Sequence, residues 1–198
     1  MQKGDCKMAI ISISTATKQA SIFVKDRGDS FSSNIHEGDM VKNLPLVFKD
    51  MLDKHYFLRD GIERVIISNG PGYYTSLRIG ESFAKGLLVG DDIKKLFKIN
   101  SLDVLGSMSV KHGRVIAVLK ARINLYNCAV FALNVSGAMK RETADMLLTE
   151  QELETYRGIT GVGEGLNYLE KSWGNADMQI SSPDAESMYK HAYGEKIG

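Results

Sequence analysis

Two glycines, Gly70 and Gly72, flank Pro71 at a point where a short β-branched run gives way to a helical pattern. Glycine lets backbone N–H groups approach an anion, and the positive end of the following helix dipole favours that anion. The loop could therefore bind a phosphate group. Its spacing matches neither the dinucleotide fingerprint nor a Gly-Lys-Ser/Thr P-loop. A tight strand-to-helix connection that needs glycine's backbone freedom is the alternative, and local chemistry alone favours it.

Few other side chains are spaced for catalysis or metal binding. No two histidines are spaced as a pair of metal ligands one helical turn apart; they are His36, His55, His112 and His191. Cys6 and Cys128 are far apart and belong to no Cys-x-x-Cys motif, as in proteins of a reducing compartment. Ser68 has no base close to it in the sequence. We therefore expect no metal site and no catalytic residue.

The composition is typical of a globular protein that is not built to bind a polyanion by itself. Lysine plus arginine number 25 against 24 aspartate plus glutamate, so the net charge is only +1. Proteins that grip nucleic acid usually carry a basic stripe, because phosphate contacts dominate their affinity. No stretch approaches the ~20 apolar residues of a membrane span. The apolar run at residues 10–13 is too short for a secretion signal, so we expect a cytoplasmic protein.

The hydrophobic pattern predicts an α/β protein. In the first half the expected elements are strands over residues 8–14, 19–25 and 30–35, a helix over 40–55, a strand over 64–68, a helix over 74–89, a strand over 96–99 and a helix over 102–108. Pro45 falls inside the first helical pattern, so that helix should either begin near Leu44 or kink there.

The second half has a weaker pattern. We expect strands over residues 114–120 and 125–133, a helix over 149–156, a strand over 158–162, and helices over 166–173 and 184–192. The order β-β-β-α-β-α in the first half is typical of a two-lobed actin-like ATPase (ribonuclease-H-like) fold with a mixed sheet. Residues 8–108 should form the first lobe and 109–183 a smaller second lobe, with the last helix, 184–193, packing back on the first.

The glycine loop also carries a resemblance to a known family. Residues 70–80, Gly-Pro-Gly-Tyr-Tyr-Thr-Ser-Leu-Arg-Ile-Gly, resemble the Gly-Pro-Gly-Ser-Phe-Thr-Gly-Leu-Arg-Ile-Gly segment of the TsaB (YeaZ) family, and residues 84–87 continue the match. Residues 14–17 stand where the family has Asp-Thr-Ser/Ala-Thr, and residues 183–185 precede the last helix as its Pro-x-Ala does. The resemblance runs from about residue 8 to residue 196.

The resemblance implies a non-catalytic partner and scaffold of TsaD, the paralogue that transfers a threonylcarbamoyl group to adenosine in tRNA. TsaE, an ATPase, joins the same assembly, and the isolated chain should form a homodimer. It implies no cofactor of its own, with ATP and metal held by the partner subunits, and no tight direct binding of tRNA. The residues that would form a vestigial nucleotide or phosphate loop are Thr15, Gly70, Gly72 and Thr75.

Two substitutions support the loss of catalysis. Actin-like ATPases place an aspartate at the end of the first strand to help hold a metal–nucleotide complex, and magnesium prefers such oxygen ligands. Ser14 stands there, and Lys120 stands where the second sheet has its aspartate. We therefore expect neither peptidase nor independent ATPase activity. A stand-alone small ATPase or kinase of this fold is an alternative that these residues disfavour; a homodimeric structural protein without a tRNA role is one that the sequence cannot separate.

The helices predicted over residues 40–55 and 74–89 both have apolar arcs wider than packing on one sheet requires. Part of each arc should face a second chain, as the family's dimer surface does, with Gly80 and Gly86 permitting close backbone approach. The expected interface residues are Met40, Leu44, Val47, Met51, Ile79, Gly80, Phe83 and Leu87. The alternative is that the second helix is tucked between the sheet and a neighbouring helix.

Overall fold

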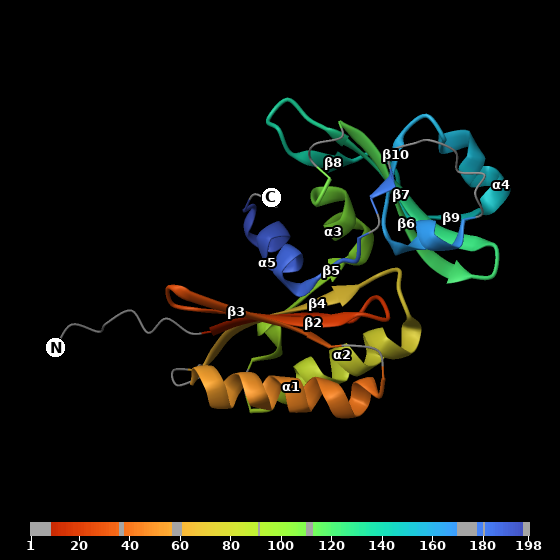
Figure 1. Cartoon of the computed structure of the whole chain (residues 1–198). Coiled ribbons are helices and arrows are strands. Elements are labelled where there is room, and N and C mark those ends of the chain that lie inside the picture. The colour runs from red at the N-terminus through yellow and green to blue at the C-terminus, as the bar shows by residue number, and fades with distance from the viewer. Residues whose placement is uncertain are drawn as a thin grey trace.

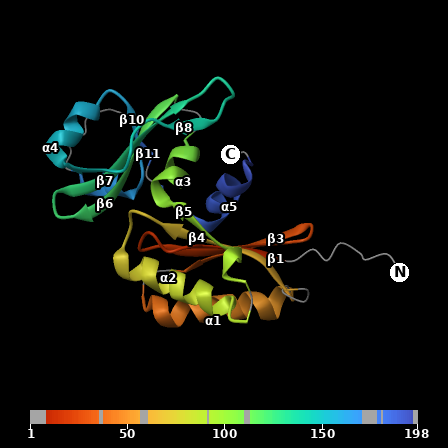
Figure 2. The ribbon, with the colours of Figure 1, turned by 180° about the vertical axis from the view of Figure 1, so that it is seen from behind.

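A computed structural model describes residues 9–35, 38–56, 61–90, 92–109, 113–169, 178–179 and 181–195. These residues form two lobes, each around a mixed β-sheet (Figure 1). The strand order is β3-β2-β1-β4-β5 in the first sheet and β11-β10-β6-β7-β8 in the second, with β9 beside β7. Helices α1 and α2 cover one face of the first sheet, and α5 and α3 lie on the other side, toward the second lobe (Figure 2).

The elements follow the predicted order. The first sheet and its helices comprise β1 Ala9–Ser14, β2 Ala20–Asp26, β3 Asp29–Ile35, α1 Met40–His55, β4 Ile62–Asn69, α2 Tyr74–Leu87, the 3-10 turn η1 Ile93–Lys95, β5 Leu96–Asn100 and α3 Ser101–Ser107. The second sheet and its connections comprise β6 Arg114–Arg122, β7 Leu125–Leu133, β8 Met139–Arg141, β9 Met146–Thr149, α4 Glu150–Leu153, η3 Glu154–Tyr156, β10 Thr160–Val162, η4 Glu164–Tyr168 and β11 Met178–Gln179, before α5 Ala185–Tyr193. The predicted two-lobed α/β fold is confirmed.

Helix α1 begins at Met40, before Leu44, which was one of the two alternatives that Pro45 suggested. Asp39 caps it, because its carboxylate accepts a hydrogen bond from the Lys42 N–H at 3.3 Å. Pro45 then lies within the helix rather than before it. A proline there removes the N–H that would otherwise bond to the carbonyl of Val41, and the apolar face of the helix outweighs this loss. The expectation that the helix begins near Leu44 is therefore wrong.

The segment predicted as a helix over 166–173 is also different. A five-residue 3-10 helix, η4, occupies Glu164–Tyr168, and residues 170–173 lie outside the described residues. The reason is close packing on β6: a Cβ on Gly163 would lie 2.3 Å from the Val118 carbonyl oxygen, and one on Gly165 2.8 Å from the same strand residue. A backbone held this close to a strand forms a tight turn. The short strands β8, β9 and β11 were not predicted, since two to four residues carry little pattern.

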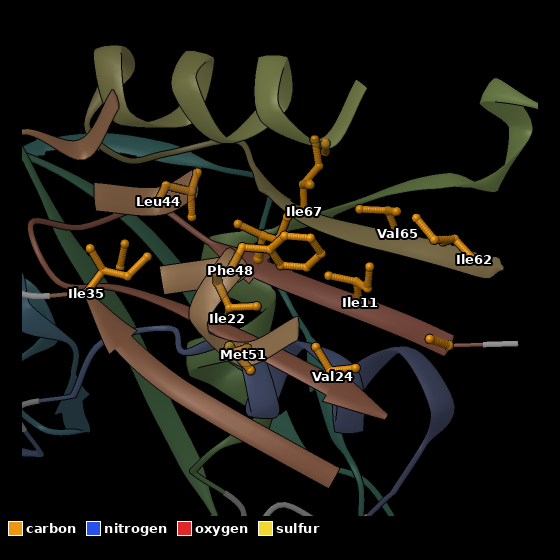
Figure 3. Packing of buried hydrophobic residues seen from close by; sticks show 14 of the residues in the cluster. Ile11, Ile22, Val24, Ile35, Leu44, Phe48, Met51, Ile62, Val65 and Ile67 are labelled. Carbon is orange, nitrogen blue, oxygen red and sulfur yellow. The ribbon is translucent and has the colours of Figure 1, made fainter. Parts of the chain in front are cut away.

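The core of the first lobe lies between the sheet and α1. Alternate residues of a strand point to opposite faces, so one set of side chains meets the helix. Figure 3 shows this set: Ile11, Ile22, Val24, Ile35, Ile62, Val65 and Ile67 from the strands, with Leu44, Phe48 and Met51 from α1. Each such side chain contributes about 1.5–3 kcal/mol when it leaves water.

In the described residues, no helix is long and apolar enough to cross a membrane.

We predict that Leu44→Ala lowers the free energy of unfolding by about 2–4 kcal/mol, because Leu44 is fully buried and the change leaves a cavity. Leu46, on the same helix, is 54% exposed. The matched control Leu46→Ala should change the stability by less than about 0.5 kcal/mol. Urea unfolding of both variants measures the difference, and equal effects would mean that α1 presents a different face to the sheet.

Candidate functional site

The glycine loop between β4 and α2 closes on the backbone that follows β1. The Tyr73 N–H donates to the Ala16 carbonyl oxygen at 2.8 Å, and a Cβ on Gly72 would lie 2.5 Å from that same oxygen. The Tyr73 N–H is therefore already bonded to a carbonyl oxygen and is not available to an anion, and the negative partial charge of that oxygen beside Gly72 disfavours an anion there. This geometry favours the tight connection over the phosphate loop.

The four loop residues predicted from the sequence are only partly brought together. Thr15, which is 1% exposed, donates its N–H to the Ser68 hydroxyl at 3.0 Å and lies one residue before the Ala16 contact with Gly72. Gly70, at φ +76°, packs against the Asn100 side chain instead. Thr75 lies on α2 and is exposed. Thr15 and Gly72 thus lie close together at the turn after β1, whereas Gly70 and Thr75 have other surroundings.

The two positions that replace catalytic aspartates make structural contacts. The buried Ser14 hydroxyl donates to the Pro183 carbonyl, and the Ala185 N–H donates to the Ser21 hydroxyl at 2.9 Å. These bonds hold the start of α5 on the first sheet. In the second lobe the Lys120 ammonium lies 3.5 Å from the centre of the Tyr168 ring, a cation–π contact. Neither position offers a carboxylate to a metal–nucleotide complex.

The titratable groups give little support for catalysis. Burial raises the pKa of the Cys128 thiol to about 12, so it stays protonated and unreactive near neutral pH. Burial also raises the pKa of Glu164, while Lys18 opposes that shift. Within the described ranges, no group of three or more His, Cys, Asp and Glu side chains could hold a metal ion. Cys6, His36 and His112 lie outside the described residues.

Two other histidines are placed by the structure, and neither has the surroundings of a catalytic base. His55 stacks on Phe31 with the ring centres 3.9 Å apart. Burial lowers the pKa of His191, although the charge of Asp103 opposes the shift. Both histidines lie on exposed positions of their helices.

An apolar groove of about 440 Å³ runs between α1 and α2 on the outer face of the first lobe. It is lined by Val41, Leu44, Pro45, Thr75, Arg78, Ile79, Ser82 and Phe83. Val41 is 63% exposed, so part of the apolar lining of the groove is open to solvent. At one end the Arg78 guanidinium donates to the Tyr74 hydroxyl at 2.7 Å. The groove combines an apolar centre with a polar rim.

Four of the eight predicted interface residues are buried within this chain and have little or no surface to present. They are Met40, Leu44, Met51 and Gly80. A Cβ on Gly80 would lie 2.4 Å from the Thr15 hydroxyl oxygen, so the close approach that we expected at Gly80 is made to this chain's own β1–β2 turn. A Cβ on Gly86 would meet no described atom within 4 Å outside its own helix.

The other four predicted interface residues are half-buried: Val47, Ile79, Phe83 and Leu87. Phe83 packs edge-on against Phe48 of α1, with the ring centres 5.5 Å apart. The wide apolar arcs therefore serve first to join α1 and α2 and to cover the sheet. The sequence did not lead us to assign every groove-lining residue to an interface. Val41 and Pro45 belong to the helical pattern that predicted α1, whereas Arg78 is a charged residue on the polar side of α2.

Comparison with known proteins connects this fold to tRNA modification. The family model described as "TsaD: tRNA N6-adenosine threonylcarbamoyltransferase" matches residues 35–149, more than half of the chain. The chain belongs to the TsaD family. A relative in Thermosipho africanus, a tRNA N6-adenosine threonylcarbamoyltransferase, is 31% identical over 97 residues, but the match covers 40% of this chain and 29% of the relative.

Two of the proteins that match most of the chain are a TsaB and a YeaZ protein. The tRNA threonylcarbamoyladenosine biosynthesis protein TsaB of Buchnera aphidicola is 24% identical over 169 residues, covering 83% of this chain and 75% of the relative. The structure of YeaZ from Pseudomonas aeruginosa superposes with a TM-score of 0.77 at 20% identity, covering 94% of this chain and 91% of that one. The predicted resemblance to TsaB (YeaZ) proteins is confirmed.

We predict that Gly72→Ala lowers the free energy of unfolding by about 1–3 kcal/mol, because the new Cβ meets the Ala16 carbonyl, which is backbone and cannot rotate away. Gly86→Ala is the matched control on α2, since no atom lies within 4 Å of the added Cβ. Removing a glycine from a helix should stabilise the protein by about 0.5–1 kcal/mol. Thermal and urea unfolding measure both changes, and a harmless Gly72→Ala would show that the loop does not close on Ala16.

Proposed function

We propose that this chain is a non-catalytic partner of a TsaD-type transferase and acts in the threonylcarbamoyladenosine modification of tRNA. Membership of the TsaD family and the likeness to a TsaB protein over most of the chain support this proposal. The single observation that carries the partner role is the apolar groove between α1 and α2, helices that lie on the side of the first sheet away from the second lobe (Figure 1).

The proposal assigns catalysis to the partner. Ser14 and Lys120 make contacts within this chain and supply no charge to a cation. A magnesium–nucleotide complex needs oxygen ligands of the carboxylate type. ATP and metal therefore belong to the partner subunits, and the chain has no peptidase or ATPase activity of its own. The proposal also includes TsaE in the assembly, a homodimer when the chain is isolated, and a cytoplasmic location.

The groove has the chemistry of a protein interface. Interface centres are depleted in charge, and a few central residues, often Tyr, Trp and Arg, dominate the energy. Here Ile79 and Phe83 supply apolar lining, while Arg78, which also lines the groove, is paired with Tyr74, with the guanidinium 5.0 Å from the ring centre. An apolar helical surface of the transferase is the occupant that this combination supports.

The groove is one part of the proposed interface. A stable interface buries about 800 Å² on each partner, so the partner should also cover residues around the groove. Leu87, further along α2, is half-buried and packs against the core of the first lobe. The same surface would bind a second copy of the chain when the transferase is absent, which accounts for the proposed homodimer.

We predict that Val41→Glu weakens association with the TsaD of the same organism by more than about tenfold, because it places a carboxylate in an apolar interface centre. The melting temperature of the variant alone should stay nearly unchanged, since Val41 is 63% exposed. Size-exclusion chromatography of the mixed proteins measures association. Leu147→Glu is the matched control, because Leu147 is 58% exposed but lies on β9 of the other lobe.

The same pair of variants tests the role in tRNA modification. In cells depleted of this protein, threonylcarbamoyladenosine measured by mass spectrometry of digested tRNA should fall. The wild type and Leu147→Glu should restore it, whereas Val41→Glu should not. Nucleoside levels that stay constant on depletion would contradict the proposed function. Restoration by Val41→Glu would leave the function intact but place the interface elsewhere.

A further inference from the structure

The outer edge of the first sheet is a second surface with unused binding capacity. β3 is the last strand of that sheet, and no described strand pairs with its outer side. One face of β3 is held by α1, where Phe31 stacks on His55. The strand is therefore ordered before any partner arrives.

The pairing register shows which backbone groups of β3 face outward. A two-residue turn, Arg27-Gly28, joins β2 to β3, and Asp26 pairs with Asp29. In such hairpins the residues flanking the turn exchange hydrogen bonds, and hydrogen-bonded and open positions then alternate along the strand. The N–H and C=O groups of Ser30, Ser32 and Asn34 consequently point away from β2.

This edge lacks the usual protection against pairing. Native sheets guard exposed edges with lysine, proline, bulges or inward-pointing charges. Residues 30–35, Ser-Phe-Ser-Ser-Asn-Ile, contain none of these, and their pairing with β2 has no register shift. A regular strand with free main-chain donors and acceptors is a template for one more strand.

A polar pocket of about 460 Å³ adjoins this edge on the face opposite to α1. It is lined by Ser21 and Ile22 of β2, Ser32 and Asn34 of β3, Met108, and Asp184, Ala185, Glu186, Ser187 and Lys190 at the start of α5. Its lining therefore includes two of the residues whose backbone faces outward.

The charges that line the pocket are paired with one another. Asp184 accepts hydrogen bonds from the N–H and the hydroxyl of Ser187, each at 2.8 Å. Glu186 and Lys190 form an ion pair at 2.9 Å. The hydroxyls and the amide that remain are suited to an uncharged side chain that both donates and accepts hydrogen bonds.

We propose that the outer edge of β3 binds an extended segment of a partner protein, which pairs through its main chain and places an Asn, Gln, Ser or Thr side chain in the adjoining pocket. Main-chain pairing at an open edge supplies affinity, and pockets for alternate side chains supply specificity.

The test is a selection of random seven-residue peptides, displayed on phage, against the full chain. The selected peptides should have alternating β-branched residues with an uncharged polar residue at a fixed position. Ser32→Pro should weaken their binding by about tenfold or more, because it removes an outward N–H and crowds the edge. Its melting temperature should stay unchanged, because that N–H takes no part in pairing with β2. Val41→Glu, in the α1–α2 groove, should bind the peptides like the wild type.

Asn34→Pro provides a second edge variant if Ser32→Pro loses stability, since the Asn34 N–H also points outward. Failure to enrich any extended peptide would overturn the proposal. So would binding of the selected peptides by both proline variants as tightly as by the wild type. A concentration-dependent dimer that Ser32→Pro abolishes, without peptide binding, would assign the edge to a second copy and also contradict it. None of these outcomes depends on the α1–α2 groove or on tRNA modification.

Discussion

The contact between the glycine loop and the Ala16 carbonyl is the constraint on which the rest of the first lobe depends. Tyr73 donates to that oxygen, and Gly72 has no side chain to prevent the approach. Helix α2 therefore starts against the end of β1, and Gly80 continues the contact further along the helix by packing on Thr15. A helix held this close to the sheet lies beside α1, and the two together form the apolar groove.

The residues that the family resemblance relates to nucleotide binding make contacts within this chain. The Tyr73 N–H and Gly72 meet the Ala16 carbonyl oxygen, and the Ser14 hydroxyl bonds to the Pro183 carbonyl. In the second lobe the Lys120 ammonium lies over the Tyr168 ring. These contacts support the proposed non-catalytic role, in which the α1–α2 groove and the outer edge of β3 are the surfaces that bind partners.

The sequence predicts most of this fold because the first half has strong periodicity. Its strands and helices appear in the predicted order, and the family resemblance rests on the glycine loop that the structure places between β4 and α2. The site is harder, because the apolar width of a helix does not say what covers it. Leu44 and Gly80 looked available to a partner, yet β-sheet residues and Thr15 cover them within the chain. The polar pocket beside β3 has no sequence signal, since serine and asparagine on an edge strand look like ordinary solvent-facing residues.

Titration of Mg–ATP into the isolated chain by calorimetry is the most direct test of the proposed non-catalytic role. It measures whether the chain binds a magnesium–nucleotide complex by itself. Because the loop faces the Ala16 carbonyl and neither Ser14 nor Lys120 can hold a cation, we predict no saturable binding up to about 1 mM, where the binding free energy is only about −4 kcal/mol. Saturable, magnesium-dependent binding well below that concentration, lost on substitution of Thr15, would contradict a structural role for the loop.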